Sequence, residues 1–213
     1  MMTFSPTSDI RRILCIGAHS DDIEIGCGGT MLRLLAQHPN VSVLWVVLGG
    51  NEAREVEART SAARFLAGAG ASDIRVQKFR DAYLPFMGEQ VKEFVESLKS
   101  FEPDLIFTHR KEDAHQDHRL LGELTWNAFR NHCILEYEVP KYDGDLGHPN
   151  VFVPLDEAVC RRKIELLMEG FPTQAGRQWF TADTFWAMLR IRGVECNSPT
   201  SFAEAFACRK LLI

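Results

Sequence analysis

The stretch that most constrains the fold is an almost continuously apolar run, Val41-Ser-Val-Leu-Trp-Val-Val-Leu48. Its length and its β-branched residues favour a strand. A strand with one face in water alternates apolar and polar residues, whereas a strand covered on both faces is apolar throughout. We therefore expect a parallel sheet with helices packed on both of its faces.

The rest of the chain alternates strand patterns with helix patterns. Strands are expected at residues 12–17, 41–48, 74–79, 104–108 and 134–139, and helices at residues 28–38, 52–67, 88–100 and 117–131. Right-handed crossovers between parallel strands would wind this alternation into a Rossmann-like three-layer sandwich. The predicted fold class is α/β with a mostly parallel sheet.

The two ends of the chain are less regular. We expect a short arm at residues 1–10, and a long loop at residues 140–154, which are rich in turn-forming residues and suit a wall or lid of a site. Two helices are expected after this loop, at residues 155–171 and 182–192, followed by a terminal segment whose type the pattern does not decide. No repeat or linker divides the chain, so residues 1–213 are expected to form a single domain.

Composition excludes several classes of protein. The net charge of −5 gives no basic footprint, so no nucleic-acid partner is expected. No apolar stretch approaches the roughly 20 residues of a spanning helix, and the N-terminus lacks the apolar segment of a signal peptide. We expect a cytoplasmic protein without membrane insertion. The six cysteines include no C-x-x-C pair, and reduced thiols are expected.

A polar cluster follows the first expected strand directly. His19, Asp21 and Asp22 follow three to six residues after an apolar run that ends at Ile16. An unpaired ion beside an apolar core costs several kcal/mol or so, which favours a partner for these groups. A metal ion suits them, because residues three apart in a tight turn can aim at one point. The glycines at 26, 28 and 29 suit a close turn into a helix.

A second polar cluster follows the strand expected at residues 104–108. Residues 109–119 contain three histidines and three carboxylates. Open parallel sheets bind ligands beyond the carboxyl ends of their strands, so the two clusters converge if their strands are neighbours. One histidine of this cluster would then join His19 and Asp22 in a set with the three protein ligands common in catalytic zinc sites.

These residues bring a family resemblance into view. His19-Ser-Asp-Asp22, followed by Gly26-Cys-Gly-Gly-Thr30 and, further on, by His115-Gln-Asp-His118, resembles the PIG-L (LmbE-like) family of zinc de-N-acetylases. Arg190-Ile-Arg-Gly193 and Phe202-Ala-Glu-Ala-Phe206 also resemble its pattern. The resemblance implies a hydrolase that removes the acetyl group from an N-acetylated amino sugar or its conjugate. Ser20 and Gln116 stand where the family usually has proline.

The resemblance also implies a role for individual residues. It implies one zinc ion per chain, with Fe(II) as the other metal that the ligand set suits, and a small-molecule N-acetyl amino sugar or conjugate as partner. The implied metal ligands are His19, Asp22 and His118, and the implied general base is Asp21. The implied histidine that stabilises the oxyanion or protonates the leaving amine is His115, with Asp117 orienting it. The implied substrate-binding residues are Arg54 and Asp81.

Other interpretations stay open at this stage. A non-catalytic nucleotide- or anion-binding module would use the glycines at a helix start, although Gly26-Cys-Gly28-Gly29 does not match G-x-G-x-x-G. A non-haem iron oxygenase would also use two histidines and a carboxylate. His109 suits either a group that orients a metal ligand or a residue satisfied by backbone. The sequence does not decide the substrate, and it is compatible with a homo-oligomer.

Overall fold

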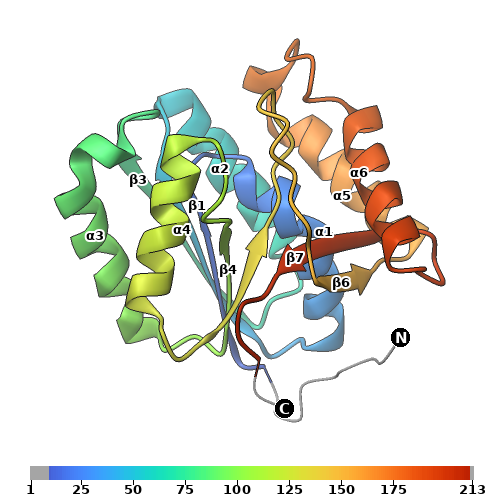
Figure 1. Cartoon of the computed structure of the whole chain (residues 1–213), viewed down its shortest axis with the longest axis horizontal. Helices are drawn as coiled ribbons and strands as arrows, with labels where there is room; N and C mark the ends of the chain where they lie inside the picture. The colour runs from blue at the N-terminus through green and yellow to red at the C-terminus, as the bar shows by residue number, and fades with distance from the viewer. Residues whose placement is uncertain (1–9, 212–213) are drawn as a thin grey trace.

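The computed structural model describes residues 10–211, which form a three-layer α/β sandwich around a seven-stranded sheet (Figure 1). In spatial order the strands are β3 (Ala71–Phe79), β2 (Ser42–Gly49), β1 (Arg12–Gly17), β4 (Leu105–His109), β5 (Cys133–Tyr137), β7 (Ala203–Ala207) and β6 (Val151–Pro154). Neighbouring strands from β3 to β5 are parallel, whereas β7 is antiparallel to both β5 and β6. The predicted mostly parallel sheet is confirmed.

Helices cover both faces of this sheet. They are α1 (Asp22–Gln37), α2 (Glu52–Phe65), α3 (Gly88–Ser97), α4 (Gln116–Ala128), α5 (Glu157–Gly170) and α6 (Ala182–Glu195), with short 3-10 turns η1 (Leu84–Met87), η2 (Leu98–Phe101) and η3 (Pro172–Gln174). One core lies between the sheet and α3 and α4, and the other lies between the sheet and α1, α2, α5 and α6 (Figure 1).

The central strands are buried on both faces, which explains their continuous apolar pattern. In β2, Trp45 and Val47 face the α1 side, whereas Leu44 and Val46 face the α3 side. All four side chains are fully buried. Side chains alternate across a strand, so each face of β2 contributes to a different core. The sequence pattern therefore reflects helices on both sides, as expected.

Helix α1 begins at Asp22, six residues before the expected start at Gly28, so its glycines lie inside the helix rather than in a turn. Close packing explains them. A Cβ atom at Gly26 would lie 2.2 Å from the ring of Tyr137, and one at Gly28 would lie 2.6 Å from the ring of Phe65. Glycine is needed here because neighbouring side chains contact the helix backbone directly.

Two expectations at the C-terminal end are corrected or completed. The loop expected at residues 140–154 ends earlier, because Val151–Pro154 forms β6, which is hydrogen-bonded to β7. The terminal segment of undecided type contains β7. Residues 1–9 of the expected N-terminal arm lie outside the described residues. Within residues 10–211, no helix has the length and apolar character needed to cross a membrane.

The strand order places the two polar clusters side by side. Strand β1 pairs with β2 on one side and with β4 on the other, so the chain changes direction across the sheet between β1 and β4. In open α/β sheets, such a switch point opens a crevice at the carboxyl ends of the strands. The cluster after β1 and the cluster after β4 both lie at this edge, as expected for strands that are neighbours.

Candidate metal centre

The first cluster turns from β1 into the first turn of α1. The backbone N–H of His19 donates to Oδ2 of Asp22 at 2.6 Å, which fixes the turn between them. His19, Asp21 and Asp22 are all buried. Buried polar groups need partners, and the second cluster supplies them for His19 and Asp22.

His118, in the first turn of α4, meets His19 and Asp22. Nδ1 of His19 lies 3.1 Å from Nε2 of His118, and each of these nitrogens lies 3.4 Å from a carboxylate oxygen of Asp22. Ligand atoms around a tetrahedral zinc ion with bonds of about 2.0–2.1 Å lie about 3.3–3.5 Å apart. The three side chains therefore have the spacing of a metal-ligand set.

Other ligating groups overlap with this set. His115 lies near His19 and His118, His109 lies near Asp22 and His118, and a third group combines His19 with Asp81 and Asp117. The structure thus brings the predicted histidines together with Asp22, Asp81 and Asp117 at one centre, and Asp21 adjoins it in the chain.

The charges of the three central groups are mutually dependent. Burial alone would raise the pKa of Asp22, but His118, His109 and His19 outweigh it and hold that pKa well below its usual value. Burial alone would lower the pKa of His19, but Asp22 and the other surrounding carboxylates raise it instead. An anionic Asp22 between two histidines is a donor set that suits a divalent cation.

Asp21 differs from its neighbour Asp22. It is buried, and its Oδ2 atom has no hydrogen-bond partner among residues 10–211. Burial, together with the charge of Asp22, raises the pKa of Asp21 to about 6. A buried carboxylate oxygen without a partner is costly, so its persistence beside a metal-ligand set suggests a chemical role.

His115 and Asp117 flank the same point. His115 precedes α4 as its N-cap, and its Nδ1 accepts a hydrogen bond from the backbone N–H of Asp117 at 3.2 Å. The proton of the neutral ring is therefore on Nε2. The carboxylate of Asp117 lies 3.4 Å from Nε2 of His19 and accepts from the N–H of Leu84. Its link to His115 runs through the backbone.

Arg54 and Asp81 lie at the outer side of the centre. Nη1 of Arg54 donates to Oδ2 of Asp81 at 3.2 Å, while Oδ1 of Asp81 lies 3.1 Å from Nε2 of His19. The side chain of Asp81 is half exposed. Gln116 donates to the carbonyl of Ala82 and so joins this segment to the second cluster.

Two further residues contact the proposed ligands: His109, whose role the sequence left open, and Asp113, to which the sequence gave no particular role. His109, the last residue of β4, is fully buried, and its Nε2 lies 3.1 Å from Oδ2 of Asp22. Oδ2 of Asp113 lies 3.1 Å from Nδ1 of His118. Metal-binding histidines usually donate their second ring N–H to such a carboxylate. Asp113 was counted among the carboxylates of residues 109–119, but its spacing of five residues from His118 gave no sign of this contact.

Comparison with known proteins identifies the family. The family model described as "PIG-L: GlcNAc-PI de-N-acetylase" matches residues 14–129, which is more than half of the chain. The chain belongs to the PIG-L family. The matched segment contains both polar clusters together with Arg54 and Asp81, so the resemblance stated from the motifs is confirmed.

One curated relative and two solved structures show the extent of the likeness. Diacetylchitobiose deacetylase of Thermococcus kodakarensis is 30% identical over 134 residues, which are 56% of this chain and 49% of the relative. The structure of N,N'-diacetylchitobiose deacetylase from Pyrococcus horikoshii, solved with its inhibitor MPG, has a TM-score of 0.72 at 22% identity and covers 94% of this chain and 84% of that chain. GalB, the 4-carboxy-2-hydroxymuconate hydratase of Pseudomonas putida, has a TM-score of 0.76 at 15% identity and covers 96% and 98%.

These comparisons differ in what they establish. The chain spans between about half and two thirds of the length of the curated relatives it matches first. At 15–22% identity, the structural neighbours show that the PIG-L chain shares their fold, and one of them is a hydratase rather than a deacetylase. Because one fold supports several reactions, the residues of the site, and not the fold, determine the reaction.

Proposed function

We propose that this PIG-L chain is a zinc-dependent hydrolase that removes the acetyl group from an N-acetylated amino sugar or its conjugate. The observation that carries the proposal is the meeting of His19, Asp22 and His118 at 3.1–3.4 Å beside the unpartnered oxygen of Asp21. A metal-ligand set next to an unused buried carboxylate is what metal-assisted hydrolysis requires. Membership of the PIG-L family supports the same reaction.

The proposed ligands are His19, Asp22 and His118, and their two nitrogens and one carboxylate suit zinc and also Fe(II). A metal ion held there supplies Lewis acidity, which lowers the pKa of a water molecule to about 7 and polarises the acyl carbonyl. Asp113 lies 3.1 Å from Nδ1 of His118 and so supports this ligand from behind, while His109, whose Nε2 accepts from the Ala18 N–H, lies 3.1 Å from Oδ2 of Asp22. Such contacts fix the orientation of metal-binding side chains.

Asp21 is the proposed general base. It adjoins the ligand Asp22, but its own Oδ2 is not engaged by another group among the described residues. A carboxylate beside the attacking water can accept its proton and pass it toward the departing amine. Two adjacent carboxylates thus have separate tasks, with Asp22 binding metal and Asp21 moving a proton.

His115 is the proposed donor to the reacting carbonyl or to the amine. Its Nδ1 accepts from the Asp117 N–H, which leaves an N–H on Nε2 for donation. Its ring lies 4.8 Å from that of His19 and 4.6 Å from that of His118, centroid to centroid, so it borders the proposed metal ligands. A donor aimed at a developing oxyanion lowers the barrier by roughly 3–4 kcal/mol in other enzymes.

Arg54 and Asp81 are the proposed substrate-binding pair. Both lie at the exposed side of the centre, where the half-exposed carboxylate of Asp81 can accept hydrogen bonds from sugar hydroxyls. The curated relative named above is a diacetylchitobiose deacetylase, which supports an N-acetyl amino sugar as the small-molecule partner. The polar pair is a binding site suited to hydroxyl groups next to the acetamide.

The test combines metal content with product release. The purified protein is analysed for zinc and iron, and acetate release is then measured with N-acetylglucosamine, diacetylchitobiose and N-acetylglucosaminyl conjugates, before and after chelation and zinc addition. We expect about one metal equivalent per chain and zinc-dependent acetate release from at least one sugar. A protein that holds its metal but releases no acetate from any of them would contradict the deacetylase assignment.

A further inference from the structure

The long loop after β5 carries two charged residues, Lys141 and Asp145, that have no role in the proposed mechanism and that meet Asp113. Nζ of Lys141 lies 2.6 Å and 2.7 Å from the two carboxylate oxygens of Asp145, and 3.0 Å and 3.1 Å from those of Asp113. The side chains of Lys141, Asp145 and Asp113 are only 10%, 14% and 5% exposed. This is a buried cluster in which one ammonium group bridges two carboxylates.

The cluster continues into the candidate metal centre. Oδ2 of Asp113, which accepts from Lys141, also lies 3.1 Å from Nδ1 of His118. Asp145 in turn accepts from the backbone N–H of Ala114 at 2.7 Å, so it holds the segment next to Asp113 as well. An unbroken series of polar contacts therefore runs from the long loop through Asp113 to a proposed metal ligand.

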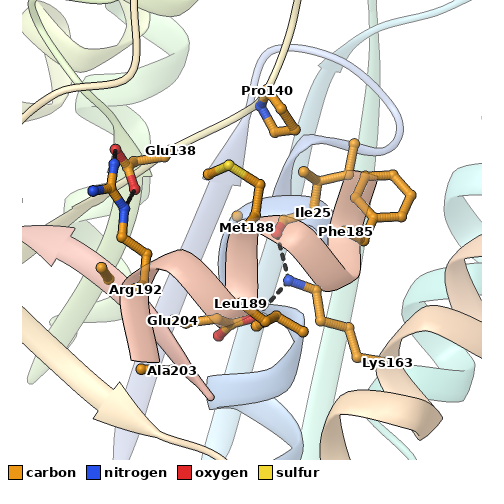
Figure 2. Close-up of a pocket in the computed structure, with 12 residues that line it drawn as sticks. Ile25, Glu138, Pro140, Lys163, Phe185, Met188, Leu189, Arg192, Ala203 and Glu204 are labelled. Atoms are coloured by element: carbon orange, nitrogen blue, oxygen red, sulfur yellow. Dashed lines mark hydrogen bonds and ion pairs between the residues drawn. The ribbon is translucent and has the colours of Figure 1, made fainter. Parts of the chain in front are cut away.

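The loop itself is anchored on its other side. Arg192 of α6 donates through Nε and Nη2 to the two carboxylate oxygens of Glu138, at 2.8 Å and 2.6 Å (Figure 2). The N–H of Gly147 also donates to Glu138. Bidentate arginine pairs have a defined geometry, so the residues on both sides of Lys141 are held in place. The position of Lys141 is therefore set by the fold on one side and by Asp113 on the other.

We propose that Lys141, supported by Asp145, is a positioning residue of the metal centre, because it holds the carboxylate of Asp113 against His118. The inference rests on the proposed metal site. Without the ammonium group, Asp113 would keep the His115 N–H and Asp145 the Ala114 N–H, but no cation would lie between the two carboxylates in this largely buried place. Asp113 would then turn away from its neighbour Asp145 and would orient His118 less well.

The test measures zinc binding in the full-length protein, in competition with a chromophoric chelator at fixed pH. Lys141→Met removes the charge but keeps an apolar stem of similar length, and Asp145→Asn is the milder second variant. We expect Lys141→Met to bind zinc roughly 10- to 100-fold more weakly than the parent, as for other residues that support metal ligands from behind. Asp145→Asn should show a smaller loss in the same direction.

Leu98→Ala is the control for a general loss of stability. Leu98 is fully buried in η2, before the amino end of β4 and so at the opposite edge of the sheet from the metal centre. Its truncation should lower the melting temperature but leave zinc affinity unchanged. Zinc affinity in Lys141→Met equal to that of the parent would overturn the inference, whereas a parent that binds no zinc would overturn the proposed function instead.

A double variant decides whether Lys141 acts through Asp113. Asp113→Asn alone should weaken zinc binding, and adding Lys141→Met to it should change the affinity by less than about threefold, because residues that act through one contact are not additive. If the two losses multiply in full, then Lys141 acts independently of Asp113. That result would contradict a positioning role through this carboxylate.

Discussion

At the scale of single residues, environment separates two neighbouring carboxylates. Asp22 lies between three histidines that stabilise its anionic form, whereas the Oδ2 atom of Asp21 is buried without a partner within residues 10–211. In the sequence, the spacing of His19 and Asp22 predicted that these two aim at one point, and the family resemblance added the role of base for Asp21. What distinguishes them is which of them His118 and His109 reach across the sheet.

Asp21→Asn tests the proposed base. The amide has nearly the same shape but cannot accept the proton, so we expect zinc binding close to that of the parent and a fall in kcat of roughly 10²- to 10⁴-fold. Zinc stoichiometry and acetate release are measured on the same preparation. Full turnover in Asp21→Asn would show that another group takes the proton.

His115→Ala and Asp22→Ala distinguish the overlapping ligand groups. If His19, Asp22 and His118 are the ligands, Asp22→Ala loses most of its bound zinc, whereas His115→Ala keeps about one equivalent and loses turnover. Elemental analysis after identical purification measures both. The reverse pattern, with zinc lost in His115→Ala and kept in Asp22→Ala, would favour the group made of His19, His115 and His118.

At the scale of elements, the strands followed from the sequence better than the start of α1. Continuous apolar runs locate β1, β2 and β4 because burial on both faces leaves no other pattern. The start of α1 was misplaced because glycines normally weaken a helix, and only tertiary contacts such as that of Gly26 with Tyr137 explain them. A contact between residues so far apart in the chain leaves no local signal.

Gly26→Ala should destabilise the protein even though alanine favours a helix. The added methyl group would lie 2.2 Å from the Tyr137 ring, and overpacking a core costs about 1–3 kcal/mol, which corresponds to a fall in melting temperature of roughly 2–12 °C. Gly88→Ala is the matched control, because a Cβ atom there meets nothing within 4 Å. We expect Gly88→Ala to be neutral or slightly stabilising. Equal melting temperatures for parent and Gly26→Ala would contradict the packing explanation.

At the scale of the whole molecule, the site is an assembly of distant segments. The sequence predicted that the clusters after β1 and β4 would meet if these strands were neighbours, and the strand order confirms the condition. It did not predict the contact of Lys141 with Asp113, because a lysine in a turn-rich loop is ordinarily solvated. Only the path of the loop between β5 and β6 brings this charge to the buried site.

Because the site is assembled from distant segments, bound metal should increase the free energy of unfolding. Its proposed ligands come from the turn after β1 and from α1 and α4, and an unfolded chain does not hold them together, so zinc should stabilise the folded protein by mass action. Free zinc at about 100 times its Kd contributes about 2.7 kcal/mol, which raises the melting temperature by roughly 5–11 °C. Thermal unfolding with zinc and with chelator measures this shift. Leu98→Ala should melt lower but keep the full zinc-dependent shift, while Asp22→Ala should lose it. A shift of the same size in Asp22→Ala would mean that zinc binds elsewhere on the protein. The polar clusters after β1 and β4 would then not form the zinc site.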